Sequence, residues 1–179
     1  HGTGFPSRCT NAGVMGTLRF TPSERTGSTI VVHVPGSKSV ANRALVCASL
    51  AEGQSTLRSV PGGDDCNAMV SALGAVNNAG TVSLGSTRIG GAIWDADLAG
   101  TTSRFLTAMA VLGEAPTVID GREPLRRRPM ADLHNALMHL GADVEPLGEP
   151  GHLPVSVSRG SARGGQVTVR GDVSSQFVS

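Results

Sequence analysis

The sequence predicts an α/β protein of the α+β kind, built from a strand–helix module that occurs more than once. Short stretches such as residues 154–158 and 164–169 alternate apolar and polar side chains, which is the period of strands. Over residues 65–76 and 129–140, apolar side chains instead recur at helical spacing. The third observation is that segments of the chain resemble one another in the same order.

The regular elements are expected to begin after an N-terminal extension, residues 1–27. We interpret this extension as loosely ordered, because its only periodic stretch is a short strand pattern near residues 17–20. The stretch STIVVHV, residues 28–34, predicts the first strand. The polar turn PGSKS follows it, and a helix is expected to start there.

Each of the two helical stripes is followed by a glycine, Gly74 after the first and Gly141 after the second. A glycine after the last apolar residue is a common signal for the end of a helix. The residues around these glycines, SALGA and MHLGA, also resemble each other. Both helices are therefore expected to stop in the same way.

A longer similarity relates the segment at residues 41–57 to the segment at residues 102–118. It places Arg43 and Arg104 at equivalent positions, just after the start of a helix. Each unit is then expected to run strand, turn, helix, strand, helix and two further strands. The expected boundaries are residues 28–91 for repeat one, 92–163 for repeat two and 164–179 for the start of repeat three. Because the third repeat stops a few residues into its first helix, we expect the chain to be part of a larger protein.

Composition excludes several classes of function. The net charge of +1 and the low aromatic content, one Trp, four Phe and no Tyr, argue against a nucleic-acid-binding protein. No apolar run is long enough to span a membrane. Three cysteines without a CxxC pair fit reduced thiols better than disulfides. The five scattered histidines do not predict a metal site.

Three equivalent strand-to-helix turns, GSKSVANR, LAGTTSR and GDVSSQ, carry cations or hydroxyl groups at the start of a helix. Cations are unfavourable at this end, where the helix dipole is positive, whereas the free N–H groups there bind anions. Lys38, Arg43, Arg104 and the arginine run at residues 126–128 would therefore need anions to offset their charge. The turns predict a site for one or more anions.

Structural interpretations of the same residues remain open. Serine and threonine at these turns are also common N-caps. Arg43 and Arg104 also fit solvated side chains or ion pairs, and the arginine run fits a solvated loop. The acidic candidates for such pairs are Asp64, Asp65 and Asp97, of which the first two also fit the capped start of a helix. The occurrence of three equivalent turns favours the anion site.

Four motifs together resemble the 5-enolpyruvylshikimate-3-phosphate synthase family. They are PGSKSVANRAL at 35–45, LAGTTSRFL at 98–106, RRRPM at 126–130 and SSQF at 174–177. The resemblance runs from about residue 29 to the end of the sequence, and PGSKS followed by NR is its most specific part. The sister family, UDP-N-acetylglucosamine enolpyruvyl transferase, typically has Lys-Asn where this chain has Lys-Ser, so it is the alternative.

The resemblance implies a fold of two similar domains, each made of three βαβαββ units around a pseudo-threefold axis, with this chain holding part of one domain. It also implies a transferase of the shikimate pathway, which serves aromatic amino-acid biosynthesis. Such an enzyme moves the enolpyruvyl group of phosphoenolpyruvate to the 5-hydroxyl of shikimate 3-phosphate. In the family the acid–base residues lie further along than Ser179, so this chain alone is expected to be an inactive fragment.

The resemblance also assigns roles to individual residues of this chain. Lys38, Ser39 and Arg43 would contact shikimate 3-phosphate. Lys38 would also reach phosphoenolpyruvate and is the expected catalytic cation. Gly100 and Arg128 would hold phosphoenolpyruvate.

Further residues come from the third turn, where Ser174 and Ser175 would bind the shikimate phosphate and Gln176 would lie between the two substrates. One departure is Leu98, where many family members have asparagine, so one polar side chain is missing beside Gly100.

The resemblance implies no cofactor, metal, nucleic acid or membrane, and the complete enzyme is expected to be a cytoplasmic monomer. A non-catalytic module that binds a phosphorylated metabolite is the alternative from another class.

Overall fold

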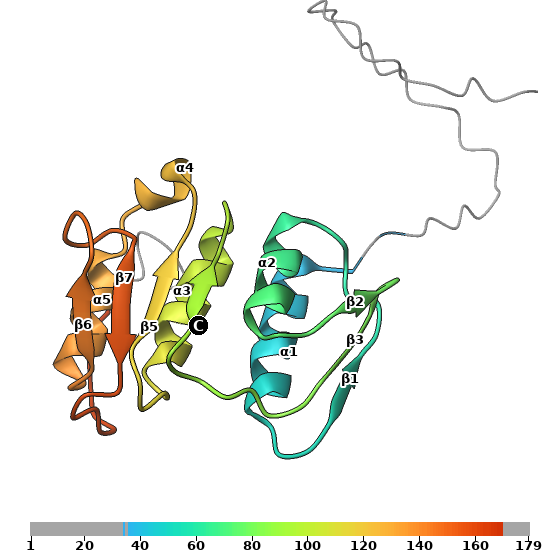
Figure 1. Ribbon diagram of the computed structural model, residues 1–179, viewed down its shortest axis with the longest axis horizontal. Helices are drawn as coiled ribbons and strands as arrows, with labels where there is room; N and C mark the ends of the chain where they lie inside the picture. Colours follow the sequence, from blue (N-terminus) through green and yellow to red (C-terminus); the bar gives the residue numbers. More distant parts are fainter. Residues whose placement is uncertain (1–33, 35, 170–179) are drawn as a thin grey trace, which may run out of the picture. The chain divides into compact units, whose positions relative to one another are not determined.

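The computed structural model describes residue 34 and residues 36–169 (Figure 1). In this part the predicted order of elements occurs once in full and once without its first strand, which falls almost entirely outside the described residues. The first set is α1 (Lys38–Leu50), β1 (Ser55–Leu57), α2 (Asp64–Ala72), β2 (Asn77–Asn78) and β3 (Thr81–Leu84). The second set is β4 (Ile93–Asp95), α3 (Gly100–Ala110), β5 (Thr117–Asp120), α4 (Glu123–Arg126), α5 (Ala131–His139), β6 (Asp143–Pro146) and β7 (Val155–Ser158). The short helix α4 has no counterpart in the first set and was not predicted.

The two sets also share a sheet topology. In the first sheet the order is β1-β3-β2 with antiparallel pairs, and in the second it is β4-β5-β7-β6. Strands β5, β7 and β6 repeat the first sheet, and β4 adds a strand parallel to β5. A parallel neighbour requires a crossover connection, which α3 provides between β4 and β5. The predicted α/β fold class, with its repeated unit, is confirmed.

Helices α2 and α5 end in the same local structure, as their glycines predicted. Gly74 has a φ of 67° and Gly141 a φ of 94°, a left-handed conformation in which a side chain would be strained. The next residue then donates a backbone hydrogen bond five residues back, from Ala75 to Val70 at 2.9 Å and from Ala142 to Leu137 at 3.0 Å. These bonds satisfy carbonyl groups at the helix ends.

One hydrophobic core joins the two sets of elements. Leu45 of α1, Met69 of α2, Leu106 of α3 and Ile119 of β5 are fully buried in the same cluster. Helices α1, α2 and α3 pack against one another, which brings the starts of α1 and α3 together. Among residues 34 and 36–169, no helix is both long and apolar enough to cross a membrane.

The strand predicted at residues 164–169 is wrong. This segment forms no ladder within the part of the chain that the structure describes. Val167 and Val169 are half-buried and Thr168 is exposed, so within the described residues the alternation in the sequence matches packing of one side of an extended segment. The helix predicted from residue 129 starts two residues later, because Met130 is the N-cap.

Several predictions fall on residues outside the described part. These are the extension at residues 1–27, nearly all of the first strand at 28–34 and the part of the third repeat beyond residue 169. The boundaries of the three repeats remain predictions.

Candidate anion-binding site

The first residues of α1 and α3 line one hollow with a volume of about 340 Å³. Its walls are formed by Lys38, Ser39, Asp65, Leu98, Gly100, Thr101, Arg104 and Arg128. Neither N-cap residue, Ser37 of α1 or Ala99 of α3, makes a side-chain capping bond, so Ser37 is not the conventional cap considered from the sequence. Two helix starts with N–H groups that no cap side chain satisfies form a favourable setting for an anion.

Lys38 reaches across this hollow to helix α2. Its Nζ lies 3.0 Å from Oδ2 of Asp65, and its side chain is 67% exposed. Because the Asp65 carboxylate accepts a hydrogen bond from the ammonium group and attracts its charge, the pKa of Lys38 is raised above its usual value. Lys38 is therefore fully protonated at neutral pH, the form that binds anions.

Arg128 approaches the start of α3 so closely that a side chain at Gly100 would displace its guanidinium group. A Cβ at Gly100 would stand 2.7 Å from Arg128 Nη1. The two neighbouring arginines behave differently: Arg126 forms a two-point pair with Asp120, at 2.9 and 2.7 Å, and Arg127 pairs with Glu123 at 3.2 Å. Within the described residues no carboxylate pairs with Arg128. The arginine run thus contributes one guanidinium group to the hollow and uses two for local ion pairs.

Arg104 contributes a second guanidinium group from the second turn of α3. Burial lowers its pKa, and the charge of Arg128 lowers it further. This shift records two unfavourable effects on the cation, loss of water and repulsion by a like charge. An anion bound in the hollow would relieve both.

Arg43 lies one turn further along α1 and is not part of the wall. Its Nη1 donates to the carbonyl of Ser39 at 3.1 Å, and its guanidinium carbon lies 5.2 Å from the ring centre of Phe105 on α3. That distance is within the range of a cation–π interaction. Arg43 is thereby held at the edge where α1 faces α3.

A buried hydrogen-bond chain connects the three helices beneath the hollow. Nδ2 of Asn42 on α1 lies 3.3 Å from Oγ1 of Thr102 on α3, and the Thr102 hydroxyl donates to the carbonyl of Asp65 on α2 at 2.8 Å. Asn42 is 1% exposed and Thr102 is fully buried. These bonds fix the start of α2 against the start of α3.

The structure brings together four of the residues predicted for the site, Lys38, Ser39, Gly100 and Arg128, and places Arg43 at the edge. Ser174, Ser175 and Gln176 lie outside the described residues.

Four lining residues, Asp65, Leu98, Thr101 and Arg104, had no role assigned by the resemblance, although Arg104 was among the cations expected at the anion site. The self-similarity of the sequence pointed to Arg104 through its match with Arg43. Asp65 was interpreted as the start of a helix, and it does lie in the first turn of α2. Its contact with Lys38 depends on how α1 and α2 pack. Asp97, the other candidate acid, pairs with Arg122.

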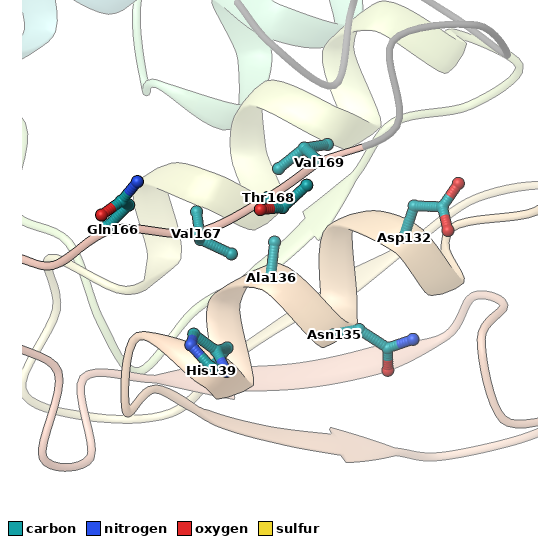
Figure 2. Close-up of a pocket in the computed structure, with 8 residues that line it drawn as sticks. All are labelled: Asp132, Asn135, Ala136, His139, Gln166, Val167, Thr168 and Val169. Carbon is teal, nitrogen blue, oxygen red and sulfur yellow. The ribbon is translucent and has the colours of Figure 1, made fainter.

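A larger hollow, about 540 Å³, lies elsewhere, between α5 and the extended segment at residues 166–169. Figure 2 shows the residues that line it: Asp132, Asn135, Ala136, His139, Gln166, Val167, Thr168 and Val169. No lysine or arginine is among them. Its volume exceeds that of the first hollow, but its side chains do not suit a phosphorylated ligand.

Comparison with known proteins adds independent information. Residues 24–179 match the model of a family described as EPSP synthase (3-phosphoshikimate 1-carboxyvinyltransferase). Proteins named 3-phosphoshikimate 1-carboxyvinyltransferase from Shewanella pealeana and Shewanella piezotolerans are 35% and 36% identical to this chain over 177 residues. These matches cover 92% of this chain but 41% of each relative. The chain therefore spans about two-fifths of the length of the curated relatives that it matches.

Solved structures agree with this match. A structure of EPSP synthase from Acinetobacter baumannii aligns with a TM-score of 0.68 and 26% identity over 76% of this chain and 34% of its own. A second structure of an EPSP synthase from the same organism aligns with a TM-score of 0.70 and 25% identity, over 82% and 36% respectively.

Proposed function

The chain belongs to the EPSP synthase family, and we propose that the complete protein transfers the enolpyruvyl group of phosphoenolpyruvate to the 5-hydroxyl of shikimate 3-phosphate. The observation that carries this proposal is the meeting of Lys38, Arg104 and Arg128 with two helix starts around one hollow. Both proposed substrates carry a phosphate group, and phosphoenolpyruvate also carries a carboxylate. Guanidinium groups bind such anions through paired hydrogen bonds.

Each residue of the site has a proposed role. Lys38, Ser39 and Arg43 contact shikimate 3-phosphate, and Lys38 extends to phosphoenolpyruvate. Gly100 and Arg128 hold phosphoenolpyruvate, since the glycine offers an N–H at the start of α3 and leaves room for the guanidinium group.

In the same proposal, Ser174 and Ser175 bind the phosphate of shikimate 3-phosphate, and Gln176 lies between the two substrates. Arg104 is added because it lines the hollow beside Arg128. Its charge contributes to the potential that attracts both anions.

The proposed chemistry makes one C–O bond and breaks another. Carbon C3 of phosphoenolpyruvate accepts a proton, and the 5-hydroxyl oxygen attacks C2 while losing its own proton. The resulting tetrahedral intermediate loses inorganic phosphate from C2 and a proton from C3, which restores the double bond. The described residues serve this sequence by binding and by offsetting negative charge on the phosphate as it departs, the role of fixed cations and N–H groups in a preorganised site.

Phosphate release by the complete protein tests the proposal. Release should require phosphoenolpyruvate and shikimate 3-phosphate together, and UDP-N-acetylglucosamine should not replace the latter. Lys38→Met should lower kcat/KM by about 100- to 1000-fold, the usual effect of removing a group that stabilises developing charge. The control Arg127→Met removes an exposed cation that pairs with Glu123 and should leave kcat/KM within about twofold. Binding of both substrates without phosphate release would overturn the proposed transferase function.

A further inference from the structure

We propose that Asp65 is a positioning residue that holds the Lys38 ammonium group in the anion-binding site. This inference deepens the proposed function and rests on it. Its first basis is the contact itself, since Asp65 Oδ2 lies 3.0 Å from Lys38 Nζ across the gap between α2 and α1. Asp65 is also the acidic residue among those lining the hollow, which it shares with three cations, Lys38, Arg104 and Arg128.

The second basis is the support beneath Asp65. The hydroxyl of Thr102 donates to its carbonyl at 2.8 Å, and Asn42 adds a contact to the same hydroxyl at 3.3 Å. Both supporting side chains are buried, whereas in the ion pair the Lys38 side chain is 67% exposed and the Asp65 side chain 25% exposed. Exposed ion pairs contribute little to stability. The buried chain fixes the backbone of Asp65 rather than strengthening the ion pair itself, and the carboxylate reaches Lys38 from this fixed point.

The third basis is the presence of two further cations in the same hollow, which like-charge repulsion sets against Lys38. Arg104 and Arg128 line the same hollow, and the lysine side chain is long and exposed. Without a counter-charge, a flexible ammonium group would turn away from two guanidinium groups into solvent, where its hydration is complete. The Asp65 carboxylate offsets this repulsion and keeps Lys38 directed across the starts of α1 and α3.

This geometry predicts different effects on binding and on chemistry. In Asp65→Asn the hollow loses one negative charge, and Lys38 carries one positive charge away as it turns outward. The net charge of the site then changes little, so KM for phosphoenolpyruvate should stay within about threefold. Turnover requires Lys38 near the reacting groups, and misplacing such a group by about 1 Å can cost about 100-fold. We therefore expect kcat to fall by about 10- to 100-fold.

Matched variants separate positioning from a structural role. Asp64→Asn removes the same charge from the same helical turn, where the exposed Asp64 does not pair with Lys38, and should leave kcat within about twofold of wild type. Asp65→Glu keeps a carboxylate within reach and should recover most of the lost kcat. A structural role for Asp65 would instead lower the melting temperature, and both Asp65 variants would lose kcat alike. That result, or an unchanged kcat in Asp65→Asn, overturns the inference.

Lysine-selective ¹⁵N NMR of the complete protein tests the position of Lys38 without relying on turnover. Lys38 is the only lysine among these 179 residues, and its signal is assigned by its loss in Lys38→Arg. Inorganic phosphate should shift this signal in wild type and Asp64→Asn, and shift it much less in Asp65→Asn. The titration midpoint of Lys38 should also move to lower pH in Asp65→Asn.

The two experiments fail in distinguishable ways. If wild type does not release phosphate from the two substrates, the proposed transferase function is wrong, while the NMR titration still decides whether Asp65 positions Lys38 for an anion. If wild type is active but phosphate shifts Lys38 equally in wild type and Asp65→Asn, the inference about Asp65 is wrong and the function stands. If inorganic phosphate causes no shift of the Lys38 signal in wild type, the inference about Asp65 is also overturned.

Discussion

The guanidinium group of Arg128 lies against the point where a side chain on Gly100 would begin. A Cβ there would stand 2.7 Å from Nη1 of Arg128 and 3.7 Å from Nη1 of Arg104. The first distance is too short for any real contact, so one of the two groups would have to move. Arg128 is exposed and its guanidinium group is the far end of a flexible side chain, so Arg128 would move.

Gly100→Ala should therefore impair binding without unfolding the protein. Gly100 does not have a positive φ, so alanine fits the backbone. The unfolding free energy should change by less than about 1 kcal/mol. KM for phosphoenolpyruvate should rise about tenfold or more, which corresponds to about 1.4 kcal/mol. Steady-state kinetics and thermal melts of the complete protein measure both quantities. An unchanged KM would show that Arg128 is not needed at the position it occupies.

Adjacent arginines provide a second prediction. Arg128→Ala should weaken phosphoenolpyruvate binding by about 2–5 kcal/mol, the cost of removing one partner of a hydrogen-bonded charge pair. Arg127→Ala breaks only the exposed pair with Glu123 and should change binding by less than about 0.5 kcal/mol. Titration calorimetry measures both variants. Equal effects would mean that the run acts through its total charge rather than through one positioned group.

The buried Thr102 hydroxyl should matter for stability. Thr102→Val keeps the shape of the side chain but leaves the Asp65 carbonyl and the Asn42 amide without their shared partner. A buried polar group without a partner costs about 1–3 kcal/mol. Chemical denaturation should show a loss of this size, whereas Thr81→Val, at an exposed strand position, should change stability by less than about 0.5 kcal/mol. If Thr102→Val leaves the free energy of unfolding unchanged, water or another group satisfies the Asp65 carbonyl and the Asn42 amide.

His134 on α5 should make stability depend on pH. It is 3% exposed, and burial, with a further contribution from the charge of His152, lowers its pKa from 6.5 to about 4. Below pH 6.5 the unfolded chain takes up a proton that the folded protein does not, so stability is lost as the pH falls from 6.5 to 4. The loss should reach up to about 3 kcal/mol.

Denaturation at several pH values checks this prediction. His134→Gln should remove this part of the pH dependence, and His139→Gln, at an exposed position on the same helix, should retain it. Identical pH profiles for wild type and His134→Gln would exclude His134 as the source.

The repeat could be predicted because it depends on local chemistry. Gly74 and Gly141 mark helix ends through a backbone conformation that few other residues adopt, and both signals were correct. The segment at residues 164–169 was assigned wrongly, because alternation shows only that one side of an extended segment is covered and does not show whether another strand pairs with it. Its period alone could not separate the two cases.

The anion site was predicted only in part, for a related reason. Lys38, Gly100 and Arg128 stand in recognisable motifs, whereas the partner of Lys38 comes from a different helix. Asp65 carries the ordinary signal of an acidic residue in a first helical turn. Whether it faces solvent or a lysine depends on the packing of α1 against α2, which no local pattern encodes.

The shared core has a consequence for how the chain unfolds. Leu45 and Met69 come from the first set of elements and Leu106 and Ile119 from the second, yet all four lie in one cluster. Because this cluster draws on both sets, opening one set exposes apolar surface of the other. Amide protons in α1 and α3 should therefore exchange with solvent at the same free energy, through one concerted opening. We therefore expect the duplicated module to unfold as a single cooperative unit, in which a defect in either copy destabilises both.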